Sequence, residues 1–127
     1  MPEAIVYIDR SEIRAGMLAD LTTAISSIVA FVEEHEPQLI SYGFFIDPAT
    51  SEMSVVAVHP DSASLEFHLG VAGPEFRKVR AFIDLRSIEV FGVPSQTVLD
   101  RLNQKAQALG KNPRVIVHHA EAGFSRL

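Results

Sequence analysis

Short stretches in which apolar and polar residues alternate, or in which β-branched residues accumulate, predict five strands. They cover residues 4–8, 39–46, 53–58, 85–93 and 114–119. The second and third strands are separated by the turn-rich sequence Asp47–Ser51 and are expected to form a hairpin. At least three of the strands are apolar on both faces, so the sheet that they form should be covered on both sides.

Other stretches predict helices, from apolar residues at steps of three and four or from capping residues at their ends. The predicted helices cover residues 17–32, 62–69, 74–82 and 95–110. Pro37 should stop the first helix, because the residue before a proline is forced out of the helical region. Asp61 and Ser95 are good N-cap residues for the second and the last helix, and Gly110 is expected to end the last one in the usual C′ position.

The order of these elements predicts the fold class. Strand, helix, strand, strand, helix and strand follow one another over about residues 4–93, which is the order of an α+β, ferredoxin-like βαββαβ core. A further helix and strand over about residues 94–127 form a C-terminal extension. Since no repeat or flexible linker is visible, we expect a single domain over residues 1–127. An apolar sheet face without helices favours a homodimer in which two sheets pack face to face.

Composition and charge exclude several classes of function. The chain has 11 basic and 16 acidic side chains and no basic stripe, so we expect no binding to nucleic acid. It contains no cysteine, which excludes disulfides, thiolate nucleophiles and cysteine–metal sites. No stretch has the pattern of a signal peptide or a membrane-spanning helix, so we expect a cytoplasmic protein that binds no membrane.

The five histidines are the main candidates for chemistry. His35 should be solvated at the end of the first helix, where a cation suits the helix dipole. His59 ends a strand and His68 lies in the following helix, so both could line one pocket, although a partly buried structural histidine is the simpler interpretation of each. His118 and His119 leave a strand on opposite faces and cannot hold one metal together. Without any HExxH-type spacing, we expect no metal.

Aromatic residues on the predicted strands and helices are candidates for binding a ligand. Tyr7 and Tyr42 are the only phenols, and each hydroxyl could orient a ligand or simply reach solvent or a backbone carbonyl. Phe44 and Phe67 could supply apolar wall. The sequence contains neither the GxSxG pattern of serine hydrolases nor a phosphate-binding P-loop.

The segment His59–Leu69 followed by Gly73–Phe76 resembles the central motif of the antibiotic-biosynthesis-monooxygenase-like family, within the dimeric α+β barrel group. The matching positions are His68, Leu69, Pro74 and Phe76. The resemblance implies a homodimer of ferredoxin-like subunits, each with an apolar pocket between helices and sheet. Some members of the family oxidise polycyclic aromatic substrates with O₂ and no cofactor, whereas others degrade haem.

The sequence departs from the better-studied members of that family in two residue types. The haem-degrading and quinone-forming members rely on a tryptophan, and this chain has none. Its asparagines, Asn103 and Asn112, both lie in the extension, so the catalytic asparagine of those members has no counterpart in the core. Of the family's catalytic positions, only His68 carries over.

The resemblance therefore implies a monooxygenase-like protein that needs no cofactor and acts on a small apolar or aromatic molecule. His68 would hydrogen-bond or deprotonate the substrate. The residues expected around the substrate are His59, Tyr42, Phe44 and Phe67. Because no complete acid–base or redox set is visible in the sequence, a non-enzymatic homodimer that binds a ligand or a partner is the alternative.

Overall fold

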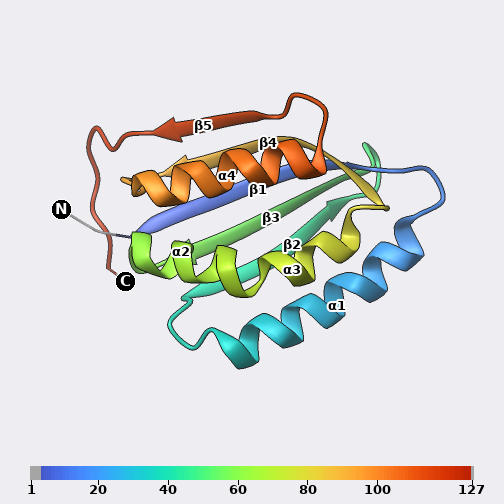
Figure 1. Cartoon of the computed structure of the whole chain (residues 1–127), viewed down its shortest axis with the longest axis horizontal. Helices are drawn as coiled ribbons and strands as arrows, with labels where there is room; N and C mark the ends of the chain where they lie inside the picture. Colours follow the sequence, from blue (N-terminus) through green and yellow to red (C-terminus); the bar gives the residue numbers. More distant parts are fainter. Residues whose placement is uncertain (1–3, 127) are drawn as a thin grey trace.

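A five-stranded sheet carries the helices on one of its faces in the computed structural model, which describes residues 4–126 (Figure 1). The strands are β1 (Ile5–Ile13), β2 (Ser41–Asp47), β3 (Glu52–His59), β4 (Ile83–Phe91) and β5 (Arg114–His118). Their order across the sheet is β2-β3-β1-β4-β5, and only the β4–β5 pair is parallel within the described chain. The predicted α+β class, with a βαββαβ core and an added helix and strand, is confirmed.

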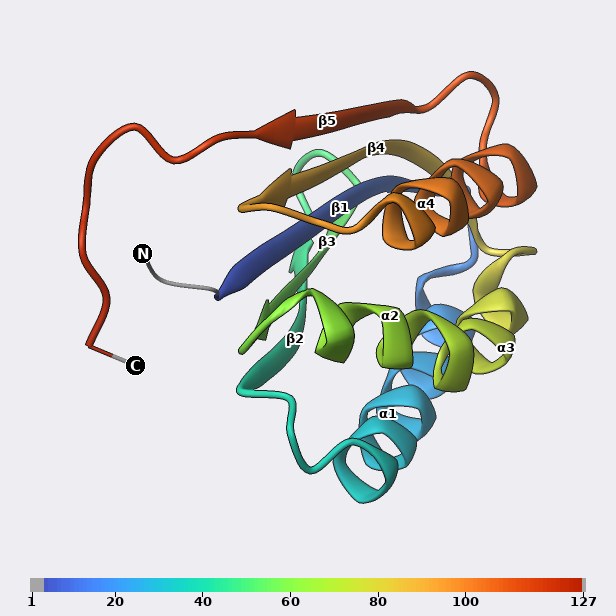
Figure 2. The ribbon, with the colours of Figure 1, turned by 60° about the vertical axis from the view of Figure 1, so that its left-hand side comes forward.

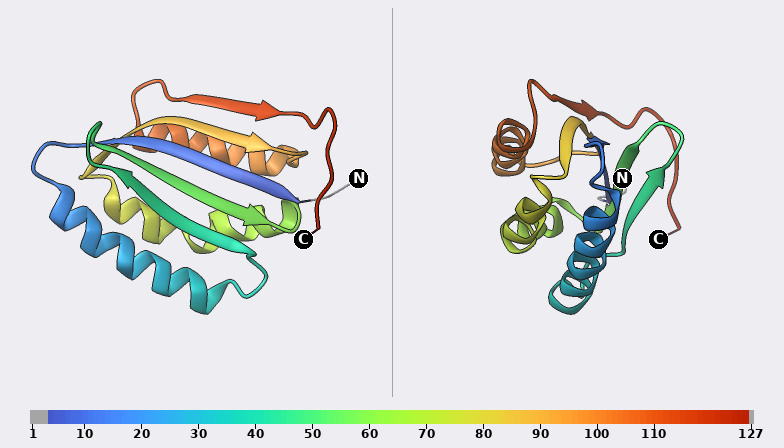
Figure 3. Two further views of the ribbon diagram at one scale, coloured as in Figure 1. Left: turned by 180° about the vertical axis from the view of Figure 1, so that it is seen from behind. Right: turned by 90° about the vertical axis from the view of Figure 1, so that its right-hand side faces the viewer.

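The helices form a second layer beside the sheet (Figure 3). They are α1 (Leu18–His35), α2 (Ser62–Val71), α3 (Gly73–Phe76) and α4 (Gln96–Leu109), and a 3-10 turn at Arg77–Val79 follows α3. Figure 1 shows α4 of the extension lying beside α2, across β4 and β1. Among the described residues, no helix is long and apolar enough to cross a membrane.

Both predicted N-caps, at the starts of α2 and α4, are confirmed. The Asp61 carboxylate accepts a hydrogen bond from the backbone N–H of Ser64 at 2.8 Å, and the Ser95 hydroxyl accepts one from Val98 at 3.2 Å. In addition, the backbone N–H of Ser95 donates to the hydroxyl of Ser62 at 2.8 Å. This last bond connects the first turn of α2 to the first turn of α4.

Strand β1 is longer than the sequence analysis predicts. A polar connection is expected from Asp9 onward, but the strand continues to Ile13. The reason is that the alternation begun by Ile5 and Tyr7 continues through polar residues. Asp9 and Ser11 point toward the helices and are buried, and Ile13 closes the same row. A buried carboxylate is therefore placed among core residues.

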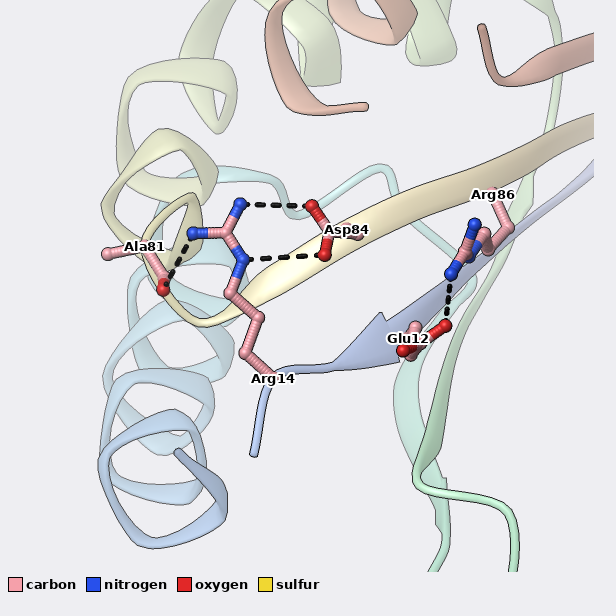
Figure 4. Close-up of polar contacts among 5 residues, drawn as sticks. All are labelled: Glu12, Arg14, Ala81, Asp84 and Arg86. Atoms are coloured by element: carbon pink, nitrogen blue, oxygen red, sulfur yellow. Dashed lines mark hydrogen bonds and ion pairs between the residues drawn. The ribbon is translucent and has the colours of Figure 1, made fainter. Parts of the chain in front are cut away.

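The helical segment predicted for residues 74–82 ends at Val79, three residues early. The side chain of Arg14 fixes the turn that follows and leads into β4. Its guanidinium donates to the two oxygens of the Asp84 carboxylate at 2.9 and 3.4 Å and to the carbonyl of Ala81 at 3.2 Å (Figure 4). The neighbouring pair Arg86–Glu12 joins the same two strands. These contacts hold the first residues of β4 against the end of β1, so β4 starts at Ile83, earlier than predicted.

The face of the sheet that carries no helix is here called the open face (Figure 3). Its apolar side chains are half-buried or exposed and include Val6, Ile8, Phe45, Val56, Val58, Phe91 and Ile116. Charged side chains lie on it as well, and Arg10 pairs there with Glu89. The chain beyond β5 runs past the end of the two layers, where the Phe124 ring is exposed (Figure 2).

Gly110 ends α4 as predicted, but for a different physical reason. A C′ glycine usually adopts a left-handed conformation, whereas Gly110 is extended at φ −152° and ψ 174°. What excludes a side chain here is the neighbouring strand, because a Cβ on Gly110 would lie 2.3 Å from the Leu85 carbonyl oxygen. The end of α4 therefore packs directly against the backbone of β4.

We expect Gly110→Ala to destabilise the protein, because either α4 or β4 must move to admit the methyl group. The free energy of unfolding should fall by about 1–3 kcal/mol, as in other overpacked sites. Gly73→Ala is the matched control, since a Cβ there has no neighbour within 4 Å. Urea unfolding of both variants measures the effect. Equal stability of the two variants would contradict the close packing of α4 on β4.

Candidate active site

A cavity of about 370 Å³ lies between the sheet and the helices. Its walls come from β1, β2 and β3 on one side, and from the α2–α3 segment and α4 on the other. The apolar part of the lining includes Val55, Leu69, Phe76 and Ala108. The side chains with polar groups in the lining are Tyr7, Tyr42, His68, Arg77, Arg101, Gln104 and Lys105. A mostly apolar cavity with a few polar groups is typical of a small-molecule site.

His68 is held by a buried carboxylate. Its Nδ1–H donates to both oxygens of Glu36, at 2.7 and 2.9 Å, and the Glu36 side chain is fully buried. Glu36 is the residue that follows α1, so the end of that helix delivers the carboxylate to α2. In the neutral ring this bond places the single proton on Nδ1 and the free lone pair on Nε2, as in a base oriented by a carboxylate.

Tyr42 completes this side of the cavity. Its ring meets the His68 ring edge-on at 5.2 Å between centroids. Burial raises the pKa of the Tyr42 hydroxyl well above its ordinary value, and the nearby carboxylates of Asp9 and Glu36 raise it further. The phenol therefore stays protonated and can donate a hydrogen bond to a bound molecule.

A second cluster of polar side chains connects β1 to the C-terminal extension. The Tyr7 hydroxyl donates to Oδ2 of Asp9 at 2.6 Å, and Lys105 Nζ donates to the Tyr7 hydroxyl at 2.7 Å and to Asp9 Oδ2 at 3.1 Å. The Lys105 ammonium also lies 4.1 Å from the centre of the Phe76 ring. Burial, with the Asp9 charge, raises the pKa of Tyr7. Asp9 thus binds two side chains that line the cavity, the Tyr7 phenol and the Lys105 ammonium.

The structure brings together some of the predicted site residues and separates others. His68 and Tyr42 line the cavity. His59 is fully buried behind His68, with 5.4 Å between ring centroids, and its Nδ1 is bonded to the Ser64 hydroxyl at 2.8 Å. Phe44 packs behind Tyr42 and does not line the cavity. Phe67 is 49% exposed outside it, because one residue along a helix turns the side chain by about 100° from His68.

Burial keeps His59 in its neutral form. It lowers the pKa of His59 to about 3, with a smaller contribution from the positive charge that His68 can carry. The Nε2 atom of His59 has no hydrogen-bond partner within the described chain, so the ring is not a ready proton carrier. Its contacts support the His68 ring from behind.

Sequence reasoning missed the three residues that turn His68 and Tyr42 into a polar site. Glu36 and Lys105 lie 32 and 98 residues away from the partners that they reach, and no spacing rule connects such positions. Asp9 alone carried a signal, because it falls in phase with Ile5 and Tyr7 on the core face of β1.

The remaining histidines lie away from the cavity. His35 Nδ1 is 2.8 Å from the Phe31 carbonyl, and His118 Nε2 is 3.1 Å from the Glu89 carboxylate. Within residues 4–126, no three histidine or carboxylate side chains gather as a metal site would require.

Comparisons with known proteins agree with this architecture. Neither family models nor curated proteins match the sequence. Among solved structures, MupZ from Pseudomonas fluorescens superimposes with a TM-score of 0.74 at 19% identity, covering 98% of this chain and 95% of that chain. SnoaB from Streptomyces nogalater, described as a cofactor-independent oxygenase, gives a TM-score of 0.60 at 15% identity, over 74% of this chain and 96% of that one.

A third similar structure carries the family name itself. It is a Bacteroides thetaiotaomicron protein classed with the antibiotic biosynthesis monooxygenases, with a TM-score of 0.53 at 14% identity over 65% of this chain and 85% of that chain. The chain has the antibiotic-biosynthesis-monooxygenase-like fold. The resemblance seen in the sequence is thereby confirmed at the level of fold. The match to MupZ extends into the α4–β5 extension, since it covers 98% of this chain.

The buried neutral state of His59 predicts a loss of stability in mild acid. The unfolded chain binds a proton at this side chain below about pH 6.5, whereas the folded chain does so only near the lowered pKa of about 3. Stability should therefore fall as the pH decreases through this window, by about 2 kcal/mol between pH 7.5 and pH 5.

His59→Asn keeps a group able to bond Ser64 and removes the titration. Urea unfolding of both proteins at pH 7.5, 6 and 5 gives the difference in slope. A variant that loses as much stability as the parent over this range would contradict the assignment to His59.

Proposed function

We propose that this protein is a monooxygenase-like enzyme that begins by removing a proton from a small, largely apolar or aromatic substrate. One observation carries the proposal: the Glu36–His68 pair and the Tyr7–Asp9–Lys105 group reach the same cavity. The first provides a base, and the second provides the Lys105 ammonium as a donor for the negative charge that proton removal creates. Such paired roles are the common requirement of proton abstraction beside a carbonyl or a phenol.

His68 is the proposed general base. Proton transfer to Nε2 makes the ring an imidazolium, and the carboxylate of Glu36 stabilises that charge from the other side of the ring. Glu36 also fixes the ring orientation, so Glu36 is a positioning residue and His68 is the catalytic one. The neutral His59 ring behind His68 limits the movement of the imidazole.

Lys105 and Tyr42 are the proposed partners of the substrate oxygen. Both line the cavity, and burial keeps the Tyr42 phenol protonated, whereas the one proton of the Tyr7 hydroxyl is donated to Asp9. An enolate or phenolate formed beside these donors is stabilised in a largely apolar surrounding, where hydrogen bonds to charge are strong.

The oxygen step that the fold suggests needs no redox group from the protein. A deprotonated methylene carbon beside an aromatic ketone is electron-rich, and its reaction with O₂ converts CH₂ to C=O and releases one H₂O. The methylene carbon supplies the four electrons that reduce O₂, and His68 accepts the proton that is removed from this carbon at the start. SnoaB, which shares the fold, is described as a cofactor-independent oxygenase, which supports this reading.

The proposed assembly is a homodimer through the open face. Phe45, on the edge strand β2, is 60% exposed there, and apolar side chains of β1, β3 and β4 lie on the same face of the sheet. Exposed apolar area of this kind is uncommon on monomers and is covered economically by a second copy.

The catalytic proposal is tested with anthrone, a planar ketone with an acidic CH₂. We expect the protein to accelerate loss of deuterium from 10,10-dideuteroanthrone without oxygen, and to form anthraquinone with uptake of one O₂ in air. His68→Gln should lower both rates about 100-fold or more, and Lys105→Met should lower them as well. Mass spectrometry and an oxygen electrode measure the two steps.

The exposed histidine at the end of α1 gives the matched control, His35→Gln, which should leave both rates unchanged. Deuterium loss without oxygen uptake would retain the base and contradict the monooxygenase step. Unchanged rates in His68→Gln would overturn the role of His68.

The dimer is tested by sedimentation at micromolar concentration. Phe45→Glu places a charge on the open face and should produce monomers, whereas Phe67→Glu places one on α2, away from that face, and should leave the dimer intact. A parent protein that sediments as a monomer would contradict this assembly.

A further inference from the structure

The charged side chains that line the cavity are all cationic. Besides Lys105 they are Arg77, on the 3-10 turn, and Arg101, on α4, and no carboxylate belongs to the lining in the described part of the chain. This is unexpected in a protein with a net charge of −5. A lining with this bias attracts anions, because fields are focused in clefts with apolar walls.

The two arginines differ from Lys105 in having no carboxylate partner. Lys105 is neutralised by Asp9, whereas neither arginine forms an ion pair within residues 4–126. Arg101 is not loose, because its Nη1 donates to the carbonyl of Glu66 at 3.1 Å. Its charge therefore stays at the cavity without being compensated there.

The position of the arginines divides the cavity by chemistry. Arg77 and Arg101 are exposed and also line the cavity, so they lie where it meets solvent. Tyr7 and His68 are buried residues of the same cavity, so the polar catalytic groups are at its inner end. Apolar side chains such as Leu69 and Phe76 line the space as well.

We propose that the substrate carries a carboxylate on its apolar body, and that Arg77 and Arg101 bind this carboxylate at the entrance. Guanidinium groups match a carboxylate in charge and geometry, with two parallel N–H donors each. The substrate class is then a small apolar or aromatic acid that enters with its reactive end first. This inference rests on the proposed function, because it assumes that the cavity is the substrate site.

Binding measured by calorimetry tests the inference without turnover. The probes are 2-naphthoate and its neutral analogue 2-naphthamide, which share one ring system. The parent should bind the acid about tenfold more tightly than the amide, and this preference should shrink as salt is added. Arg77→Gln and Arg101→Gln should each weaken binding of the acid about threefold, and the double variant about tenfold, without effect on the amide.

Arg80→Gln is the matched control, because Arg80 is an exposed arginine next to the 3-10 turn and does not line the cavity. It should bind both probes as the parent does. Amide shifts in NMR locate the probes: Gly70 and Gly73, which line the cavity, should respond, and Gly16 should not.

Several outcomes would overturn the inference. They are equal affinity for acid and amide, an equal loss in the Arg80 control, and no binding of either probe. His68→Gln should keep the preference for the acid. A parent protein that shows this preference but neither exchanges deuterium nor takes up O₂ would count against the proposed reaction alone. Loss of the preference in an enzyme that still exchanges deuterium would count against the carboxylate alone.

Discussion

The buried Asp9 carboxylate is the constraint on which the arrangement of this protein depends. A carboxylate removed from water costs several kcal/mol unless a cation and hydrogen bonds compensate it. Lys105 and the Tyr7 hydroxyl both bind Oδ2 of Asp9, whereas Oδ1 has no hydrogen-bond partner among the described residues. Lys105 belongs to a helix outside the βαββαβ core. The extension is therefore attached to the core by a charge that the core cannot satisfy by itself. With α4 held in this way, the space between α2 and the sheet becomes a cavity that is lined by both the helices and the strands.

A similar arrangement recurs on the other side of the cavity, where Glu36 lies behind His68. In both cases the carboxylate is buried and the group in front of it is a proton donor or acceptor. A molecule in the cavity therefore meets an imidazole, an ammonium, two phenols and two guanidinium groups, and no carboxylate side chain of residues 4–126 directly. The negative charges orient these groups from behind and hold them at fixed positions. This arrangement favours a substrate that becomes negatively charged during the reaction.

Much of the fold could be predicted from the sequence because it depends on local patterns. The stripe of α1, the caps at Asp61 and Ser95, and the hairpin of β2 and β3 are each encoded within a few residues, and they appear as expected. Of the candidate site, His68 and Tyr42 were accessible in this way. Glu36 and Lys105 were not, since their roles arise only when distant segments meet. A polar residue such as Asp9 in a row of core-facing positions is the one local sign that a partner from a distant segment binds there.

The division of the site between two parts of the chain has a consequence for how such proteins can diverge. The base and its orienting carboxylate belong to the core, whereas Lys105 and Arg101 belong to α4. The hydrogen bond between Ser62 and Ser95 fixes the first turns of α2 and α4 to each other, whatever the rest of α4 presents to the cavity. Substitutions along α4 can therefore change which molecules are accepted while the proton-transfer machinery stays as it is. The two parts of the site are joined by the Ser62–Ser95 bond, by the bond from Arg101 to the Glu66 carbonyl and by the buried Lys105–Asp9 ion pair.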